Sequence, residues 1–313
     1  MASRSSCLSA EPSLQDFLEV QNFFSLPSPA LVEKDWHVVR ALAVLRTVDA
    51  GQARLVFGGG TALSRAHRLT ERMSEDIDLK IVSETPLTRP ALRILRDNVT
   101  RALYDAGFDF DPSNPEHRQS GNGSRYTVYR LPYAALIAGE GALRPEIKIE
   151  TAVWPLRRPA RPLDVSSFWA QAFDKPAEVP LMPCADLSEI RAEKFVALTR
   201  RVGAEMADAG GPRDRTLVRH IYDLHAVRKQ VRSSGLRSLI LEIMQDDVEA
   251  YGHQFPAYRK DPVAETLRAV EGMGSDERYA AAYGEFVRDM VYGPAPEFRR
   301  ALKTVSALAD ALR

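Results

Sequence analysis

Two stretches of the chain alternate charged and apolar residues in the period of two that is typical of β-strands. Residues 76–81 read Asp-Ile-Asp-Leu-Lys-Ile, and residues 146–150 read Glu-Ile-Lys-Ile-Glu. Each stretch therefore places its charged side chains on one face and its apolar side chains on the other, toward a core. Residues 124–132 are expected to pair with 146–153 through a loop that contains Gly139 and Gly141, and the apolar run 55–57 predicts one more short strand.

Apolar residues at spacings of three and four predict helices over much of the remaining chain. One helix is expected from residue 28 or 29 to residue 50, with Ser28 as its N-cap and Pro29 as its first residue. A second is expected over 88–106, with Gly107 ending it. Beyond residue 184 the pattern predicts helices at about 185–205, 215–232, 234–246, 262–271, 276–291 and 296–312, the first two being separated by residues 209–212.

Prolines divide the chain. Six of them fall between residues 155 and 183, which excludes long helices there and predicts a connecting segment with a domain boundary. We therefore expect two domains, residues 1–183 and residues 184–313, of which the second is helical.

The segment from residue 57 to residue 82 combines a glycine turn with two spaced carboxylates. Gly58, Gly59 and Gly60 follow the short strand, and Thr61 is expected to cap a helix that begins there. Open backbone N–H groups at such a turn bind anions, so a triphosphate is expected at this place. Asp76 and Asp78 share one face of the next strand, together with Ser74 before them and Lys80 after them. Paired carboxylates on one face indicate a magnesium site.

Two charged residues of the helical part have more than one interpretation. Lys194 falls in the middle of the apolar stripe of the 185–205 helix, so it either extends past its neighbours to solvent or lies over a cleft to meet a triphosphate. Asp223 lies nearly opposite the side of its helix that Val218 and Ile221 mark as buried. Helix geometry alone therefore favours a surface pair with Arg219, one turn earlier.

Composition sets broad limits on the class of protein. The 313 residues are 45% hydrophobic and 27% charged, and no apolar run approaches the eighteen or so residues of a membrane span. The start of the chain lacks the apolar core of a secretory signal, so we expect a cytoplasmic protein without a membrane partner. Cys7 and Cys184 are too few for a disulfide framework or a cysteine zinc site, and we expect both to be structural.

The formal net charge is zero, which argues against a uniformly basic nucleic-acid-binding surface but allows local patches. Arginines cluster three times, either as phosphate-binding patches or as ordinary solvated surface. The clusters are Arg157, Arg158 and Arg161; Arg191, Arg200 and Arg201; and Arg213, Arg215 and Arg219.

The order and spacing of these motifs resemble the AbiEii/AbiGii-type toxin nucleotidyltransferases, which include the MenT group. The similarity covers roughly residues 30 to 230 and rests on Lys34-Asp35, on residues 57–63 and 74–79, and on Ala192-Glu193-Lys194 and Ile221-Tyr222-Asp223-Leu224. The catalytic domain of this family resembles the DNA polymerase β superfamily. The resemblance implies an α+β fold, with a nucleotidyltransferase-like mixed sheet flanked by helices, followed by a mainly helical C-terminal domain that completes the active-site cleft.

The resemblance also implies site residues. The third carboxylate would be Glu150, from its place at the end of its strand, with Glu146 as an alternative of the same parity. In some relatives a serine at the position of Ser74 is phosphorylated, and about two negative charges beside the acids would block the site. The implied set is Gly59, Gly60, Thr61, Ser74 and Lys194 for the NTP, Asp76, Asp78 and Glu150 for one or two Mg²⁺ ions, and Asp76, Asp78, Glu150, Lys194 and Asp223 for catalysis.

The function implied by the resemblance is magnesium-dependent transfer of NMP from an NTP to an RNA acceptor. The expected acceptor is the 3′ end of tRNA, where added nucleotides block aminoacylation and translation. The family also implies a cognate antitoxin as a partner. Two alternatives stay open, namely transfer onto a protein hydroxyl and a catalytically inactive binding module.

Overall fold

The computed structural model describes residues 11–137, 143–208 and 213–313. Cys7, the expected loop with Gly139 and Gly141 and the expected helix break at 209–212 lie outside these ranges. No helix in the described ranges is long and apolar enough to cross a membrane.

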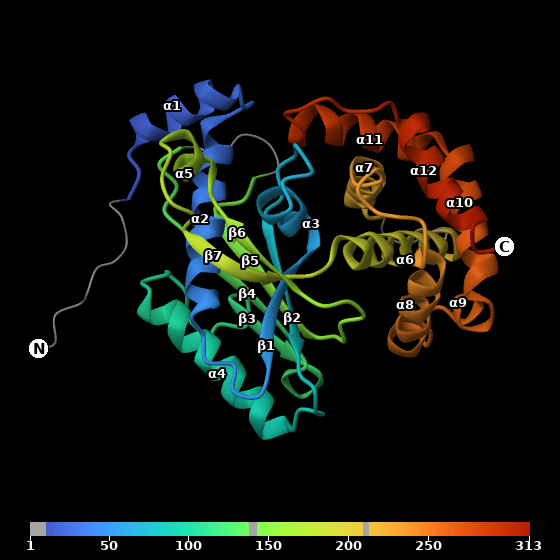
Figure 1. Cartoon of the computed structure of the whole chain (residues 1–313), viewed down its shortest axis with the longest axis horizontal. Coiled ribbons are helices and arrows are strands. Elements are labelled where there is room, and N and C mark those ends of the chain that lie inside the picture. The colour runs from blue at the N-terminus through green and yellow to red at the C-terminus, as the bar shows by residue number, and fades with distance from the viewer. Residues whose placement is uncertain (1–10, 138–142, 209–212) are drawn as a thin grey trace, which may run out of the picture.

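A mixed sheet forms the centre of the N-terminal part (Figure 1). In the described residues it has seven strands, in the order β3-β4-β5-β2-β1-β7-β6. Strand β2 lies in the middle, antiparallel to β1 and parallel to β5, so that Asp76 faces Lys148 and Asp78 faces Glu150 across the ladder. The strands are β1 (Arg54–Gly58), β2 (Asp76–Val82), β3 (Arg118–Gly121), β4 (Tyr126–Pro132), β5 (Glu146–Val153), β6 (Arg161–Val165) and β7 (Val179–Cys184).

Helices of the N-terminal part pack against this sheet and against one another. Helix α2 (Pro29–Arg46) contacts β2, β5 and β7 as well as α1 (Leu14–Phe24), α4 (Arg89–Asp105) and α5 (Phe168–Ala172). Ser28 caps α2 as predicted, because its side chain accepts a hydrogen bond from the backbone N–H of Ala30. Gly107 ends the α4 region with φ +77°, a conformation that favours glycine.

The C-terminal part is a separate group of helices around its own apolar cluster (Figure 1). Helix α6 contacts α7, α8 and α10, and α12 contacts α7 and α10. The group comprises α6 (Leu187–Ala207), α7 (Val218–Ala226), α8 (Leu236–Tyr251), α9 (Pro256–Lys260), α10 (Pro262–Ser275), α11 (Glu277–Met290) and α12 (Phe298–Asp310). The predicted α+β class is therefore confirmed. The division into two domains at residue 184 stays a prediction.

The proline-rich segment corrects one expectation. It is not only a connection, because β6 and β7 from this segment join the sheet. Prolines are tolerated there because β6 is an edge strand and β7 pairs with β1 at the single position Phe57 and Cys184, so few ladder hydrogen bonds need an N–H group. Helices α1 and α9 were not predicted, and the helix expected over 215–232 ends at Ala226.

Three consecutive charged residues of α2 are buried and hold distant backbone in place. Lys34 is 1% exposed; its Nζ donates to the carbonyls of Arg144 and Glu146, at 2.6 and 2.5 Å, and lies 2.9 Å from Glu75 Oε2. Such a cation is stable in the interior only because every donor has a partner. Its neighbours act similarly: Glu33 accepts from the N–H groups of Leu136 and Ile137, and Asp35 from that of Phe168.

We predict that Lys34→Met lowers the free energy of unfolding by about 2–4 kcal/mol, because it leaves two buried carbonyls and Glu75 without a donor. Urea unfolding followed by circular dichroism measures the change. Lys260→Met, at an exposed position, is the matched control and should change stability by less than about 0.5 kcal/mol. Equal effects of the two substitutions would contradict the anchoring role of Lys34.

Candidate active site

The glycine turn and strand β2 are in close contact. Strand β1 ends at Gly58, which is paired with Asp78, and Gly59 follows with φ +70°. A Cβ atom at Gly59 would lie 1.8 Å from Asp78 Oδ2, and one at Gly60 would lie 2.4 Å from Arg72 Nη2. The glycine at position 59 therefore lets the turn approach the Asp78 carboxylate, and the glycine at position 60 leaves room for the Arg72 guanidinium.

Thr61 does not cap the helix that follows the turn. The N-cap is Gly58, and Thr61 already has helical backbone angles. Its side chain is 1% exposed, and its hydroxyl lies 2.9 Å from Ser74 Oγ and hydrogen bonds the backbone carbonyl of Asp76. Thr61 thus ties the turn to the start of β2. The helix starts earlier than expected because the glycines themselves form its first turn, α3 (Gly59–Thr61), before the π-helical turn η1 (Ala62–Ala66).

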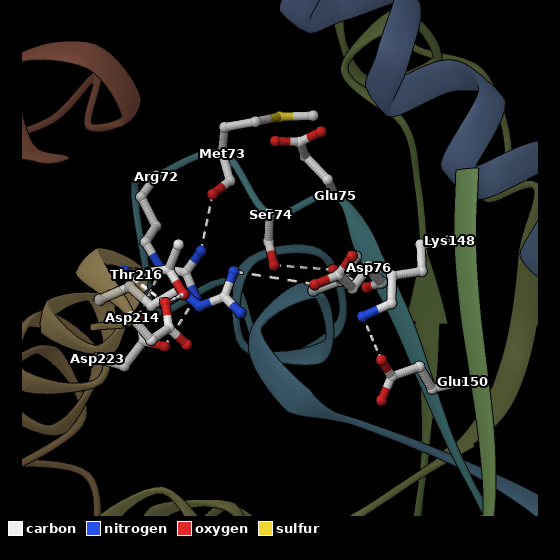
Figure 2. A network of polar contacts seen from close by, with 12 residues as sticks. Arg72, Met73, Ser74, Glu75, Asp76, Lys148, Glu150, Asp214, Thr216 and Asp223 are labelled. Atoms are coloured by element: carbon white, nitrogen blue, oxygen red, sulfur yellow. Dashed lines mark hydrogen bonds and ion pairs between the residues drawn. The ribbon is translucent and has the colours of Figure 1, made fainter. Parts of the chain in front are cut away.

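The predicted carboxylates lie on two adjacent strands, Asp76 on β2 and Glu150 on β5 (Figure 2), and Asp78 of β2 is paired with Glu150. Asp76 Oδ2 is 3.8 Å from Arg219 Nη1, and Glu150 forms an ion pair with Lys148. Burial, together with the negative charges of Asp76 and Glu150, raises the pKa of Asp78 to about 6. This part of the site therefore carries negative charge that the protein only partly balances.

The donor set fits a magnesium ion that also binds a substrate. Among the described residues, no three His, Cys, Asp or Glu side chains form a ready-made metal cage. Mg²⁺ is commonly bound by one or two carboxylates plus phosphate oxygens, and Asp76 and Asp78 can supply such carboxylates. Glu150 is directed to Lys148, and Glu146 lies four residues earlier in β5, roughly 13 Å away by strand rise.

The buried ion group of Asp223 corrects the sequence interpretation. Asp223 is 0% exposed and does not pair with Arg219. It accepts two hydrogen bonds from Arg72, Nε to Oδ1 at 2.6 Å and Nη2 to Oδ2 at 2.7 Å, and Lys194 Nζ lies 2.8 Å from Oδ2. The surface-pair expectation is wrong because α6, α11 and α12 all pack against α7, which leaves no solvent face at Asp223.

The charges of this group depend on one another. Burial alone would raise the pKa of Asp223, but Arg72 and Lys194 hold that pKa below its ordinary value. Burial also lowers the pKa of Lys194, against the opposing effect of Asp223. Lys194 is 7% exposed, so it does not extend to solvent past its neighbours.

A cavity of about 360 Å³ lies between the sheet and the helical part. Gly59, Asp78, Glu150 and Lys194 all line it, and so does His220 of α7. Its remaining walls include three aromatic side chains, Tyr126, Trp154 and Tyr251. A larger hollow of about 1010 Å³ lies around residues 81–87 at the opposite end of β2 and includes none of the predicted site residues.

Sequence reasoning missed several residues that connect the helical part to the segment before β2. Arg72 carries no motif of its own, although a buried carboxylate at Asp223 requires a cationic partner. The C-terminal part also holds the segment that leads into β2, because Met73 N donates to Met290 O at 2.8 Å and Tyr292 N donates to Glu71 O at 3.0 Å. These contacts join segments more than two hundred residues apart, so no local pattern indicates them.

Most of the predicted arginine clusters are balanced by acids. Within the described residues, seven of the nine arginines form ion pairs, and Arg158 and Arg191 do not. The paired residues are Arg157, Arg161, Arg200, Arg201, Arg213, Arg215 and Arg219.

Comparison with known proteins identifies the family. The model of the nucleotidyl transferase AbiEii toxin family, type IV toxin–antitoxin system, matches residues 40–304. Among solved structures, the nucleotidyltransferase toxin MenT4 from Mycobacterium tuberculosis H37Rv has 20% identity and a TM-score of 0.51, with 95% of this chain and 99% of that chain covered. That similarity shows the fold.

A c-di-GMP synthase, the STING-associated CdnE from Capnocytophaga granulosa, matches at 10% identity over 94% of this chain and 85% of that chain. Its TM-score of 0.28 is too low to support an argument. A comparison with curated proteins found no match. Since the family model spans most of the chain, the protein belongs to the AbiEii nucleotidyl transferase toxin family.

Proposed function

We propose that this toxin nucleotidyltransferase transfers NMP from an NTP to the 3′ end of tRNA, in a reaction that depends on magnesium. The observation that carries the proposal is the cavity in which Asp78 lies against Gly59, with Lys194 in the same lining. A glycine turn, a carboxylate and an ammonium group around one cavity match the needs of a metal-bound triphosphate.

Asp76 and Asp78 would hold the metal, with Glu150 as a further ligand or as a base once Lys148 releases it. Bound Mg²⁺ supplies two effects, a lower pKa for the attacking acceptor hydroxyl and a counter-charge for the departing pyrophosphate. In this proposal the acceptor oxygen attacks the α-phosphorus and the bond to the pyrophosphate oxygen breaks. The Asp78 carboxylate is available for the ion because Gly59 has no side chain in its way.

Lys194 would bind the triphosphate oxygens and steady the leaving pyrophosphate. Its ammonium is held by Asp223, whose other oxygen is occupied by Arg72. Asp223 is then a positioning residue, since its side chain is fully buried and acts on substrate through Lys194. Thr61, with its hydroxyl bonded to Ser74 and to the Asp76 backbone, would position the metal-binding strand in the same way.

Transfer to the tRNA 3′ end would block aminoacylation and so stop translation. Arg219 is the nearest cation to Asp76 and its side chain is 36% exposed, so it is available to contact a phosphate of the acceptor. Membership of a toxin–antitoxin family supports a cognate antitoxin as a further partner.

Asp76→Ala should lower transfer at least a hundredfold, because the substitution removes a metal ligand (~3 kcal/mol or more). The measurement incubates the purified protein with Mg²⁺, total tRNA and each α-labelled NTP separately, and resolves RNA from protein on a gel. The exposed Asp105→Ala is the matched control and should keep full activity. Label in protein alone would favour the protein hydroxyl as acceptor, and no label in either would favour an inactive binding module.

Asp78→Asn should raise the free energy of unfolding in EDTA at pH 7.5 by about 1–2 kcal/mol. This value is smaller than the full pKa shift would give, because the side chain is partly exposed. The raised pKa of about 6 means that the folded state disfavours the carboxylate, so the wild type loses stability as pH rises from about 4 through 6. Urea unfolding at pH 4 and 7.5 measures the difference, which should vanish at pH 4. Mg²⁺ should stabilise only the wild type. Equal stability of both proteins in EDTA at pH 7.5 would contradict this account.

Gly59→Ala should abolish transfer, because its methyl group would displace the Asp78 carboxylate. Gly51→Ala is the matched control, since Gly51 has a similar φ of +61° but no atom within 4 Å of an added Cβ. Both substitutions should cost about 1 kcal/mol of stability from the left-handed backbone. Thermal unfolding and the tRNA labelling assay separate the two effects, and an active Gly59→Ala protein would argue against the proposed site.

A further inference from the structure

A second cavity, of about 470 Å³, lies among α6, α7, α8 and α12 of the helical part. Its lining contains five cationic side chains, and the described residues contribute no carboxylate to it. Among the residues that the structure describes, it shares no lining residue with the cavity at Asp78. The five cations are Arg191, Arg228, Arg237, Arg300 and Lys303.

No acid of the described residues balances these cations, although Arg228 and Arg237 donate hydrogen bonds to backbone carbonyls. Within the described ranges none of the five forms an ion pair with an acid. Arg191 is the extreme case, being only 7% exposed and having a buried Nε without a hydrogen-bond partner there. An unpaired buried guanidinium is costly, and an anionic ligand would remove that cost.

The neighbouring histidine is kept neutral by burial and by two of these cations. His225 lines the cavity, and its Nδ1 lies 2.9 Å from Thr304 Oγ1. Burial and the charges of Arg228 and Arg300 lower the pKa of His225 to about 4, so this histidine stays neutral at ordinary pH.

The lining also contains buried apolar side chains, Leu236, Ile240 and Leu308. Cations beside an apolar lining suit a ligand that joins a phosphate to a flat, weakly polar body, and guanidinium groups match phosphate oxygens. We propose that this cavity binds a nucleotide through its phosphate, with Arg191 as the buried anchor. The phosphate belongs either to a free nucleotide or to a nucleotide of an RNA chain.

This site goes beyond the proposed transfer reaction and does not depend on it. Arg191 and Lys194 are three residues apart on α6 but line different cavities, and His220 and His225 of α7 are likewise divided between the two. One histidine therefore reports on each cavity. Binding can be measured in EDTA on the full chain, without any turnover.

The test is a titration of the full-length protein with uridine 5′-monophosphate in EDTA, followed by the imidazole ¹H–¹³C signals of His225 and His220. The His225 signal should move in a saturable way. Arg191→Met should lower the affinity measured from the His225 signal at least about tenfold, because it removes one buried charge-assisted contact. It should leave any His220 response unchanged. Since the substitution removes an unpaired buried charge, the melting temperature of the ligand-free variant should rise.

Two further variants keep the test decisive if Arg191→Met folds poorly. The double substitution Lys303→Gln and Arg300→Gln removes two exposed cations of the lining and should also weaken the His225 response. Lys229→Gln removes an exposed cation outside the cavity and should leave the response unchanged. An unmoved His225 signal, or equal affinity in wild type and Arg191→Met, would overturn the proposal. A titration with a 5′-phosphorylated RNA tetramer shows whether the site takes RNA or free nucleotides. If the tetramer saturates the His225 signal at a lower concentration than uridine monophosphate does, the site is assigned to RNA. If uridine monophosphate saturates it at the lower concentration, the site is assigned to free nucleotides.

Discussion

The buried carboxylate of Asp223 is the constraint on which the arrangement of this protein depends. It belongs to α7, yet its partners are Arg72 from the segment before β2 and Lys194 from α6. None of these three charges is stable alone in the interior, so each requires the other two to be in place. The ion group therefore joins the helical part to the segment before β2, next to the cavity between the sheet and the helices. The backbone bonds from residues 290–292 to residues 71–73 strengthen the same junction.

The same junction brings charged groups from the sheet and from the helices to one cavity. The sheet supplies carboxylates on neighbouring strands, and the helices supply the ammonium group of Lys194 over the same cavity. Asp76 lies near Arg219 of α7, so even the first strand residue of the site has a helical partner. A family match from residue 40 to residue 304 is consistent with this arrangement, since neither part contains the whole site.

The elements that the sequence predicted correctly are those that depend mainly on residues near one another along the chain. Alternation identified β2 and β5, a cap residue identified the start of α2, and apolar spacing identified α4, because those features depend on neighbours in sequence. Helix periodicity alone gave Asp223 a solvent face, which is wrong because α6, α11 and α12 cover α7. The prediction that Thr61 caps a helix was wrong because the preceding glycines are themselves helical. The strand Val179–Cys184 was not predicted because it contains prolines, which its sparse pairing with β1 tolerates. The ion partner Arg72 and the cavity at Arg191 depend on tertiary contacts that no sequence window contains.

A crystal grown with Mn²⁺ and a non-hydrolysable NTP would test the central claim most directly, through an anomalous difference map. The account predicts a metal peak in contact with Asp76 and Asp78, with the triphosphate between Gly59 and Lys194 and the Asp223 ion group intact. A nucleotide bound elsewhere, with no anomalous peak at these two carboxylates, would contradict it.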